Sequence, residues 1–554
     1  MLVALGPLLF ALLGLLNRDR TAAVAEPLND ASRTLSSAFA HLNVTVGGRL
    51  NSAAPFEQAC FSILEGQHVN ASATACADLQ ANYHNPLYRV ANFSAYMAPH
   101  WETCQSSPAT DGCLLDSNNA SNPLAFEGAD CRLGNVPPYY IIVQSAADVQ
   151  AALAFSNSTG VRLSVKNKGH DFLGRSSGRG TLALWTTELR NISHSAQFQP
   201  EGCSANITYD AITTGAGVLA QDVYQFADRV NRTVIGGYHQ TVGFSGGYFL
   251  GGGHSILSPV YGLAVDRVVE VKVVTPDGVF RTANECQNPD LFFALRGGGG
   301  PAFGVVIEAT HRTEPQLAIQ AAAFEFTPTG TDLADWYSLT LDNALAWANE
   351  GWGGHITGPT LIYVNPLLNT TAARASMQPA IDFVSARNGT SVVEELPSWF
   401  AFFEKYVLIA EAAIGYEGTQ GTRLLPSRLF TNASALAELH TLVTDVLPFA
   451  NPYIIAGTPW LYEPAPGAAG ATAVTPAWRD AVWHLSLSTR FAYNDTLADR
   501  EGRYRAVSAH IQGFRDLAPE SGSYFNEGDV YEPDHEVSYW GAENYAKLLA
   551  VKRK

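Results

Sequence analysis

The sequence predicts a mixed α+β protein, and three stretches carry this prediction. Residues 139–143 form a β-branched and aromatic run, residues 145–156 read as a capped helix, and residues 161–165 form a second strand. A strand, a tight turn and a returning strand follow over residues 268–281. The third stretch mixes a strand at 318–326 with helices at 332–348, 371–387 and 434–447.

Composition bounds the function before any motif is considered. The 554 residues include 34 Lys and Arg against 51 Asp and Glu, which gives a formal net charge of −17. A hydrophobic fraction of 47% with 15% charged residues excludes a disordered chain. The negative charge would repel a phosphate backbone, so we expect no nucleic-acid partner and favour a small neutral or cationic molecule.

The N-terminus has the pattern of a secretory signal peptide. Residues 2–16 are almost wholly apolar, and Ala23-Val24-Ala25 resembles a cleavage site, so we expect a signal peptide over residues 1–25. Fifteen apolar residues fall short of the ~20 that cross a bilayer, and no later segment supplies such a run. We therefore expect a secreted protein without a membrane partner. An uncleaved anchor is the alternative, because Arg18 and Arg20 follow the apolar stretch and no positive residue precedes it.

Glycosylation motifs point to the same export route. Twelve Asn-x-Ser/Thr sequons occur, which predicts a glycoprotein. They lie at Asn43, Asn70, Asn92, Asn119, Asn157, Asn191, Asn206, Asn231, Asn369, Asn388, Asn432 and Asn494.

Cysteines predict disulfides in an N-terminal collar over residues 26–133. Five of the seven lie in this stretch, at Cys60, Cys76, Cys104, Cys113 and Cys131. Their pairing stays open. Because the count is odd, at least one thiol must stay free or pair between chains, with Cys203 or Cys286 as candidates. Zinc is the competing interpretation, but no Cys-x-x-Cys or close Cys/His pair supports it, and we expect no metal.

Two glycine-rich stretches are the main functional signals. Residues 166–178 form a Gly/Ser-rich turn that could present backbone N–H groups to an anion, although an ordinary solvent loop explains this stretch equally well. Residues 236–255 hold eight glycines interleaved with large apolar side chains. Glycine permits close backbone approach to a bulky ligand, whereas a surface loop or linker would not need the apolar residues. Neither stretch fits a P-loop or the usual nicotinamide motif.

The order of these motifs resembles a known family. Gly169-His170-Asp171, Thr241-Val242-Gly243, residues 261–266 (Tyr-Gly-Leu-Ala-Val-Asp) and residues 295–306 (Leu-Arg-Gly-Gly-Gly to Phe-Gly-Val-Val) resemble the FAD-binding domain of the vanillyl-alcohol oxidase / p-cresol methylhydroxylase superfamily. Residues 524–529 and 539–548 resemble the closing segment of berberine-bridge-enzyme-like oxidoreductases. The variant at residues 169–176 resembles fungal isoamyl-alcohol-oxidase-like members.

The resemblance implies a domain plan. A two-lobed FAD-binding domain would cover residues 134–317, and an α+β substrate domain over 318–504 would place an antiparallel sheet over the flavin. A berberine-bridge-like segment over 505–554 would complete the FAD domain.

The resemblance also assigns cofactor residues. His170 matches the histidine that the family bonds covalently to the flavin, although an isolated histidine is more often a surface or core residue. Many relatives add a cysteine bond two residues before Thr241, where this chain has His239, so we expect attachment through His170 alone. Val242 matches a position that influences oxygen access and favours an oxidase. The remaining cofactor contacts would be Lys166, Asn167, Lys168, Gly169, Asp171, Gly174, Thr241, Val242, Gly243, Gly246, Gly247, Gly251, Gly252, Gly253, Asp266, Val306 and Asn526.

Catalysis needs a base for the substrate hydroxyl proton. Tyr524 matches a tyrosine near the flavin and is the first candidate, whereas Phe172 stands where several plant relatives have an active tyrosine. His484 is the second catalytic candidate. Residues 482–488 alternate, so His484, Ser486 and Ser488 share one strand face, which would be either a substrate wall or a solvent-facing surface.

We therefore expect a secreted, monomeric FAD oxidase that oxidises an alcohol or a similarly activated C–H and uses O2. A dehydrogenase or oxidative cyclase of secondary metabolism with the same flavin is one alternative. A catalytically silent flavin-binding protein is another.

Overall fold

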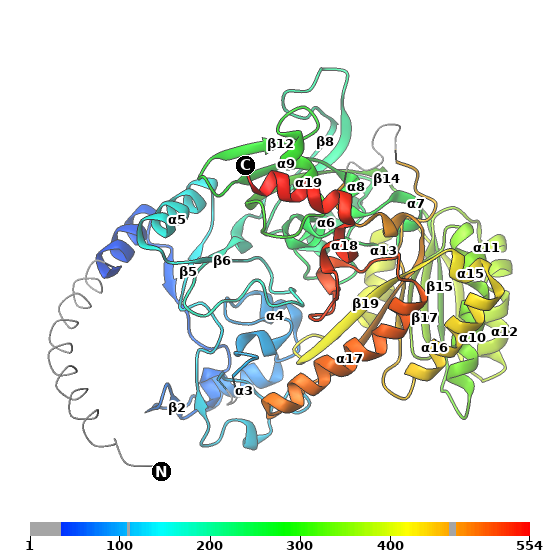
Figure 1. The fold of residues 1–554 in the computed structure, drawn as a ribbon, viewed down its shortest axis with the longest axis horizontal. Helices are drawn as coiled ribbons and strands as arrows, with labels where there is room; N and C mark the ends of the chain where they lie inside the picture. The colour runs from blue at the N-terminus through cyan, green and yellow to red at the C-terminus, as the bar shows by residue number, and fades with distance from the viewer. Residues whose placement is uncertain (1–34, 108–110, 465–471) are drawn as a thin grey trace, which may run out of the picture.

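The computed structural model describes residues 35–107, 111–464 and 472–554, which form an α+β molecule (Figure 1). The expected signal peptide over residues 1–25 lies outside the described residues. In the described part of the chain, no helix is both long enough and apolar enough to span a membrane.

The collar is a small, irregular unit closed by two disulfides. Cys60 pairs with Cys76 and Cys113 with Cys131, as the crowding of cysteines predicted. A compact core that includes Phe61 lies between them. Its elements are η1 (Gln58–Cys60), β2 (Ile63–Leu64), β3 (Gln67–His68), α3 (Ala73–Ala81), α4 (Pro86–Val90), η2 (Pro99–Glu102), η3 (Pro123–Ala125) and β4 (Asp130–Cys131). With so few ladder hydrogen bonds, this unit depends on its cross-links.

The first sheet of the expected FAD-binding region (residues 134–317) has the order β1-β5-β7-β6. Its elements are β1 (Leu50–Ser52), β5 (Tyr139–Ile142), α5 (Ala146–Thr159), β6 (Leu163–Lys166), β7 (Leu182–Trp185) and η4 (Thr186–Glu188). The β-α-β unit is confirmed, with a capping box at Ser145 and Asp148 and a left-handed Gly160 ending the helix. The sequence analysis missed β7, which lies between β5 and β6 and is parallel to both. Strand β1, from the collar, joins the sheet antiparallel to β5.

The second sheet is antiparallel with the order β12-β11-β13-β9-β8. Its strands are β8 (Ile192–Phe198), β9 (Tyr209–Gly215), β11 (Val268–Val274), β12 (Phe280–Ala283) and β13 (Val305–Arg312). Around it lie α6 (Ala220–Arg229), β10 (Arg232–Thr233), η5 (Phe244–Tyr248), α7 (Ser258–Tyr261), α8 (Ala264–Arg267), α9 (Pro289–Leu295) and β14 (Glu314–Pro315). The predicted hairpin is confirmed, with Gly278 in the left-handed conformation at its turn.

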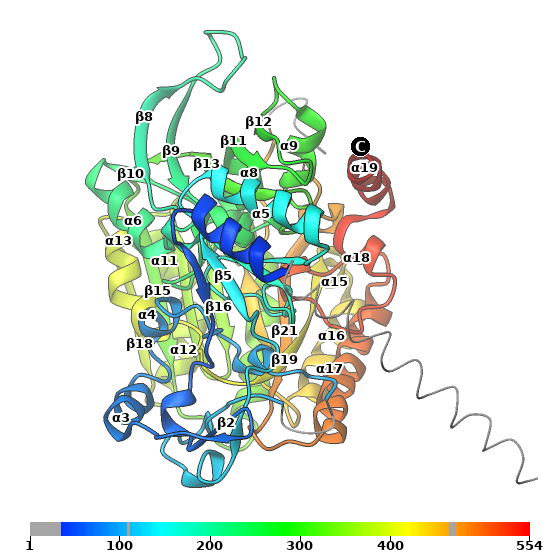
Figure 2. The same ribbon diagram turned by 90° about the vertical axis from the view of Figure 1, so that its left-hand side faces the viewer.

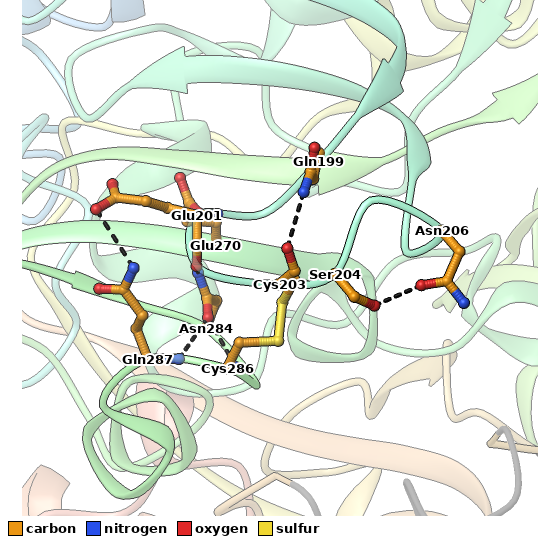
Figure 3. The surroundings of a disulfide bond; sticks show 9 residues. All are labelled: Gln199, Glu201, Cys203, Ser204, Asn206, Glu270, Asn284, Cys286 and Gln287. Atoms are coloured by element: carbon orange, nitrogen blue, oxygen red, sulfur yellow. Dashed lines mark hydrogen bonds between the residues drawn. A yellow bond between two sulfur atoms is a disulfide. The ribbon is translucent and has the colours of Figure 1, made fainter.

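A third disulfide corrects the cysteine prediction. We expected Cys203 or Cys286 as the unpaired thiol, but these two residues pair with each other (Figure 3). The reason is that the β8–β9 loop folds back over β11 and β12. There the Glu201 N–H donates to the Glu270 carboxylate at 2.7 Å and Asn284 donates to the Glu201 carbonyl at 2.9 Å. Among the described cysteines, the one outside a disulfide is Cys104.

The expected substrate region (residues 318–504) is built on one seven-stranded antiparallel sheet with the order β18-β15-β17-β16-β20-β21-β19. Figure 1 shows helices α10, α11, α12, α15 and α16 on one side of this sheet and the FAD-binding region on the other. The strands are β15 (Ile319–Glu325), β16 (Gly353–Thr357), β17 (Thr360–Asn365), β18 (Thr390–Leu396), β19 (Gly418–Pro426), β20 (Tyr453–Ala456) and β21 (Ala481–Arg490). The helices are α10 (Asp332–Asn349), α11 (Thr370–Ser376), α12 (Gln378–Ser385), α13 (Trp399–Phe402), η6 (Phe403–Val407), α14 (Leu408–Ala410), α15 (Arg428–Thr431), α16 (Ala433–Val446) and η7 (Pro476–Arg479).

One predicted helix of this region is two helices. The stretch 371–387 breaks between α11 and α12 at Met377. Pro379 lies in the first turn of α12, where its missing N–H costs nothing, whereas inside one long helix it would remove a hydrogen bond.

The C-terminal residues tie the two regions together. They form α17 (Leu497–Leu517), η8 (Phe525–Glu527), α18 (His535–Trp540) and α19 (Ala542–Lys552). Helix α17 packs on β19, so the boundary expected between residues 504 and 505 falls inside a helix of the substrate region. Figure 2 shows α18 and α19 on the side of the molecule away from α6 and α13. Buried Arg515 binds Asp529 at 2.8 Å and Glu532 at 2.6 Å, which fixes the segment that carries η8.

Candidate active site

The two glycine-rich stretches meet at His170. This residue lies in the loop after β6, and its Nε2 is 2.7 Å from the hydroxyl oxygen of Thr241. The His170 ring also lies edge-on to the ring of His239, with centroids 4.8 Å apart. The structure therefore brings together the predicted attachment histidine and the residue at the position of the second, cysteine attachment.

The electrostatic surroundings keep His170 neutral. Burial, with smaller contributions from His239 and Lys168, lowers the pKa of His170 well below its usual value. Burial also lowers the pKa of His239, to about 4. A neutral imidazole has a free lone pair on one ring nitrogen, which is the form that can act as a nucleophile.

Asn167 explains two of the predicted glycines. Its amide group donates to the Thr186 hydroxyl at 2.8 Å and to the Ala216 carbonyl at 2.7 Å, which locks the side chain. A Cβ on Gly243 would overlap the Asn167 carbonyl oxygen, and a Cβ on Gly246 would lie 2.7 Å from its Cγ. These glycines let the two loops pack together. Gly247 differs, because a Cβ there would meet nothing within 4 Å.

The C-terminal segment closes the same glycine block. Asn526 donates to the Tyr248 carbonyl at 2.9 Å and to the Tyr524 hydroxyl oxygen at 2.8 Å. Its side chain lies so close to Gly251 that a Cβ there would overlap it. Gly252 and Gly253 have φ of +131° and +75°, which also favours glycine. The Gly253 N–H donates to Tyr524 at 3.2 Å.

The two predicted lysines hold the loop in place through their ammonium groups. Lys166 donates to carbonyls of the collar, including that of Ala95 at 2.6 Å, and its Nζ lies 4.2 Å from the Tyr96 ring centroid. Lys168 donates to the Thr187 hydroxyl at 2.6 Å. Burial lowers the pKa of both lysines to about 7. Their charges therefore face the protein, and only their backbone groups are left to meet a ligand.

Asp171 organises the loop after His170. Its carboxylate accepts from the Arg175 side chain at 2.7 Å and from the Ser176 N–H at 3.1 Å. Gly169 and Gly174 have φ of +81° and +70°, and a Cβ on Gly174 would overlap the ring of Trp101. The loop is thus a fixed structure, which argues against an ordinary solvent loop.

Three other predicted contacts lie outside this junction of loops or beside it. Val242 is half-buried within the block. The Asp266 carboxylate binds Arg479 through two hydrogen bonds and also accepts from the Leu263 N–H. Val306 is buried in β13 opposite Val273, in the core of the second sheet.

A polar cluster lies on the sheet face that points toward the glycine block. His484 is fully buried on β21, and Ser486 is buried on the same face, so the solvent-facing alternative does not hold for these two residues. The His484 ring lies 5.7 Å from Tyr524 and 5.4 Å from His254, centroid to centroid. The two catalytic candidates of the sequence analysis are therefore neighbours.

The sequence analysis gave no role to Glu527, which joins this cluster. Its carboxylate lies 3.1 Å from His254 Nε2 and 4.0 Å from His484 Nδ1. Among the described His, Cys, Asp and Glu side chains, these three form a group that could hold a metal ion. Their donor atoms lie within 4.8 Å of one another. In the sequence, the one signal for Glu527 as a site residue was its position directly after the Tyr-Phe-Asn motif.

The junction of the loops suits a large polar group such as FAD. Arg175 Nη1, Ser176 Oγ and His239 Nε2 are buried and have no hydrogen-bond partner among the described residues. Two of these atoms follow the Gly169-His170-Asp171 turn and the third adjoins Thr241. Buried polar atoms without partners are costly, so a ligand with phosphate and ring acceptors would stabilise this region.

The chain matches two family models. Residues 137–284 match the FAD binding domain family, and residues 523–554 match the berberine and berberine-like family.

Several curated proteins are similar over nearly the whole chain. The FAD-linked oxidoreductase OXR2 of Pyricularia oryzae is 40% identical over 525 residues, which cover 93% of this chain and 88% of the relative. The VAO-type flavoprotein oxidase VAO615 of Thermothelomyces thermophilus is 30% identical over 95% of this chain and 89% of its own.

Solved structures share the fold of this chain. The VAO-type flavoprotein MtVAO615 from Myceliophthora thermophila superposes with a TM-score of 0.79 at 27% identity, covering 94% of this chain and 92% of that one. A glucooligosaccharide oxidase from Acremonium strictum shares the fold with a TM-score of 0.61 at 22% identity over 75% of this chain and 88% of that one. This chain therefore belongs to the FAD-linked oxidoreductases of the vanillyl-alcohol oxidase type with a berberine-bridge-like C-terminus.

Proposed function

We propose that this FAD-linked oxidoreductase is a secreted glycoprotein oxidase that oxidises a CH–OH group of a small molecule, carries FAD bound covalently through His170, and uses O2. The observation that carries the proposal is the position of His170, held by Thr241 at the junction of the two glycine-rich loops. When bound there, FAD would supply the two-electron acceptor for the substrate C–H.

The described contacts support attachment at one point. His170 is neutral and its Nε2 faces the Thr241 hydroxyl, so its orientation is fixed before any bond forms. His239 stands where many relatives have a cysteine, and an imidazole of low pKa beside His170 cannot form a thioether. Cys203 and Cys286 pair with each other in a disulfide, so neither has a thiol that could bond to the flavin.

The surface and the cross-links support secretion and glycosylation. Eleven of the twelve sequon asparagines are exposed, and Asn43 is half-buried. Exposure is required for a glycan but is also common for asparagine. The three disulfides are consistent with an oxidising compartment, where such cross-links form and persist.

The substrate would lie between the glycine block and the sheet face of β21. Trp478, Tyr524 and His484 give this region aromatic walls, with ring centroids 5.5–5.7 Å apart. Such walls bury the apolar part of a small alcohol, while the polar edges of His484 and Tyr524 can bind its hydroxyl.

Anaerobic bleaching of the purified yellow protein tests the activity. We expect 3-methyl-1-butanol, benzyl alcohol or a sugar from a substrate panel to bleach the flavin absorbance, and air to restore it with release of peroxide. Turnover with a dye acceptor but not with oxygen would identify a dehydrogenase instead. A flavin that no compound bleaches would identify a binding protein.

A separate experiment tests the attachment. The wild-type band on a denaturing gel should fluoresce under ultraviolet light, and the peptide that contains His170 should carry the mass of one FAD. His170→Ala should release its flavin in acid, whereas His239→Ala should keep it. Retention of the colour by His170→Ala would refute the attachment site.

A further inference from the structure

The surroundings of Glu527 differ from those of a carboxylate that only stabilises the fold. Glu527 ends the short helix η8, and its side chain is 20% exposed, so part of this side chain is accessible beside the cluster. It makes no ion pair with Arg or Lys among the described residues, unlike Asp529 and Glu532 in the same segment, which bind Arg515. Its polar neighbours are histidines and tyrosines.

The two carboxylate oxygens of Glu527 differ in their distances to neighbouring histidines. Oε1 lies 3.1 Å from His254 Nε2, within hydrogen-bond distance. Oε2 faces His484 Nδ1 at 4.0 Å, beyond hydrogen-bond distance. His484 is fully buried, and neither of its ring nitrogens has a hydrogen-bond partner among the described residues. A hydroxyl group placed between Oε2 and His484 would satisfy both.

Unlike the ring nitrogens of His484, the phenol oxygen of Tyr524 has hydrogen-bond partners. Its phenol oxygen accepts from the Gly253 N–H at 3.2 Å and from Asn526 at 2.8 Å. A neutral phenol that accepts these two bonds still has its O–H to donate to a substrate oxygen, and it would have to ionise before it could take a proton. Burial, with a further contribution from Glu527, raises the pKa of Tyr524 above its usual value, which also opposes a role as base.

We propose that Glu527 is the proton acceptor for the substrate hydroxyl, that His254 positions its carboxylate, and that Tyr524 donates a hydrogen bond to the same substrate oxygen. This inference rests on the proposed oxidation of a CH–OH group. As the alcohol O–H bond breaks, its proton moves to Glu527 Oε2 and its electron pair forms the carbonyl bond. The carbinol hydrogen leaves with its two electrons to the oxidant that the FAD-linked family supplies. A carboxylate becomes a carboxylic acid, and an alcohol becomes an aldehyde or a ketone.

The charge state of the cluster agrees with this role. The groups facing Glu527 are His254, His355, His484, Tyr248, Tyr453 and Tyr524. Burial lowers the pKa of both His355 and His484 to about 3, so these rings are neutral near pH 7. Burial of Glu527 opposes ionisation, but charge attraction to His254 and a hydrogen bond with it are the largest of the contributions that lower its pKa. The carboxylate is therefore ionised and able to accept a proton.

The same charge restricts the substrate. A carboxylate beside the reacting hydroxyl would be repelled by Glu527, because no Arg or Lys among the described residues pairs with it. We therefore infer a neutral alcohol as the substrate, with an apolar or aromatic portion against Trp478.

Anaerobic reduction of the flavin-loaded protein tests the role of Glu527. The probe is whichever of 3-methyl-1-butanol, benzyl alcohol and glucose bleaches the wild type fastest. Glu527→Gln keeps the size of the side chain and removes the base, so its reduction rate should fall by about 10²–10⁴ with unchanged flavin content and visible spectrum. Glu527→Asp should recover part of the rate. The matched control is Glu536→Gln in α18, whose side chain is 40% exposed and outside the cluster, and this variant should reduce at the wild-type rate.

Three outcomes would overturn the inference, and one of them also overturns the proposed function. Reduction of Glu527→Gln at the wild-type rate, with wild-type reduction intact, removes Glu527 as the base and leaves the oxidase proposal standing. One equivalent of metal in the wild type, absent from Glu527→Gln, would show that the cluster is a metal site. Failure of all three alcohols to reduce the wild type would overturn the oxidation of CH–OH and the role of Glu527 with it.

Discussion

Asn167 and Gly243 are in a contact that only glycine permits, since any Cβ at position 243 would overlap the Asn167 carbonyl oxygen. Asn167 cannot swing away without losing its hydrogen bonds to Thr186 and Ala216. This pair fixes the distance between the two glycine-rich loops, and therefore the position of His170 relative to Thr241.

Gly243→Ala should disrupt the junction of the loops. We expect a loss of about 1–3 kcal/mol in the free energy of unfolding, which is typical of overpacking, together with reduced covalent flavin content. Denaturant unfolding and the ratio of flavin to protein absorbance measure both effects. Gly247→Ala is the control, because a Cβ there meets nothing within 4 Å and its unfolding free energy should be unchanged. Unchanged unfolding free energy and flavin content in Gly243→Ala would show that this contact does not hold the loops together.

Much of this junction could be predicted from the sequence, because its parts are local motifs. The glycine runs, His170 and the Tyr524–Asn526 segment each occupy one short stretch, and the resemblance to a known family gave their order along the chain. The strand β7 escaped prediction because its four residues, Leu-Ala-Leu-Trp, include no β-branched side chain, and its parallel pairing with β5 and β6 defines it.

The electrostatic part of the site could not be predicted in this way. The proposed role of Glu527 depends on its contacts with His254, 273 residues earlier, and with His484 on β21. Lys166 and Lys168 were expected as cofactor contacts, and no sequence pattern indicated that their ammonium groups point into the protein. Lys166 donates to the Ala95 carbonyl of the collar, and Lys168 donates to the Thr187 hydroxyl.

Thr241 should control flavin attachment through His170. Thr241→Val keeps the shape of the side chain and removes the hydroxyl that lies 2.7 Å from His170 Nε2. We expect slower and incomplete covalent attachment with little loss of stability, measured as the acid-released fraction of flavin over time after mixing apoprotein with FAD. Attachment at the wild-type rate would show that the hydroxyl does not orient the ring.

The Cys203–Cys286 disulfide should stabilise the second sheet. It joins residues 83 positions apart and anchors the β8–β9 loop, so Cys203→Ser with Cys286→Ser should lower the unfolding free energy by about 2–4 kcal/mol. Cys104→Ser removes the cysteine that has no disulfide and should leave the unfolding curve unchanged. Equal losses from both changes would contradict the assigned pairing.

Glu417 should make stability depend on pH. Its carboxylate is buried with one oxygen unpartnered, and burial raises its pKa to about 7 from an unfolded value near 4.5. The folded state thus binds the proton more tightly, so stability is fully present below pH 4.5 and is lost as pH rises toward 7. Glu417→Gln should remove this loss and gain on the order of 1–3 kcal/mol at pH 8 relative to pH 4.5. Parallel stability profiles for both proteins over this range would refute the assignment.

His254 should set the acidic limit of the reaction. Because its hydrogen bond helps to lower the pKa of Glu527, the wild-type rate should be present above that pKa and fall only as pH drops through it. His254→Ala removes this stabilisation of the carboxylate, so the acidic limb of kcat/KM should move to higher pH while the rate at high pH changes less. His440→Ala is the matched control, since that half-buried histidine bonds Asp342 outside the cluster and its loss should leave the profile unchanged. A uniform fall in rate at every pH would instead show that His254 acts by packing alone, because a positioning residue that tunes Glu527 must shift the limb.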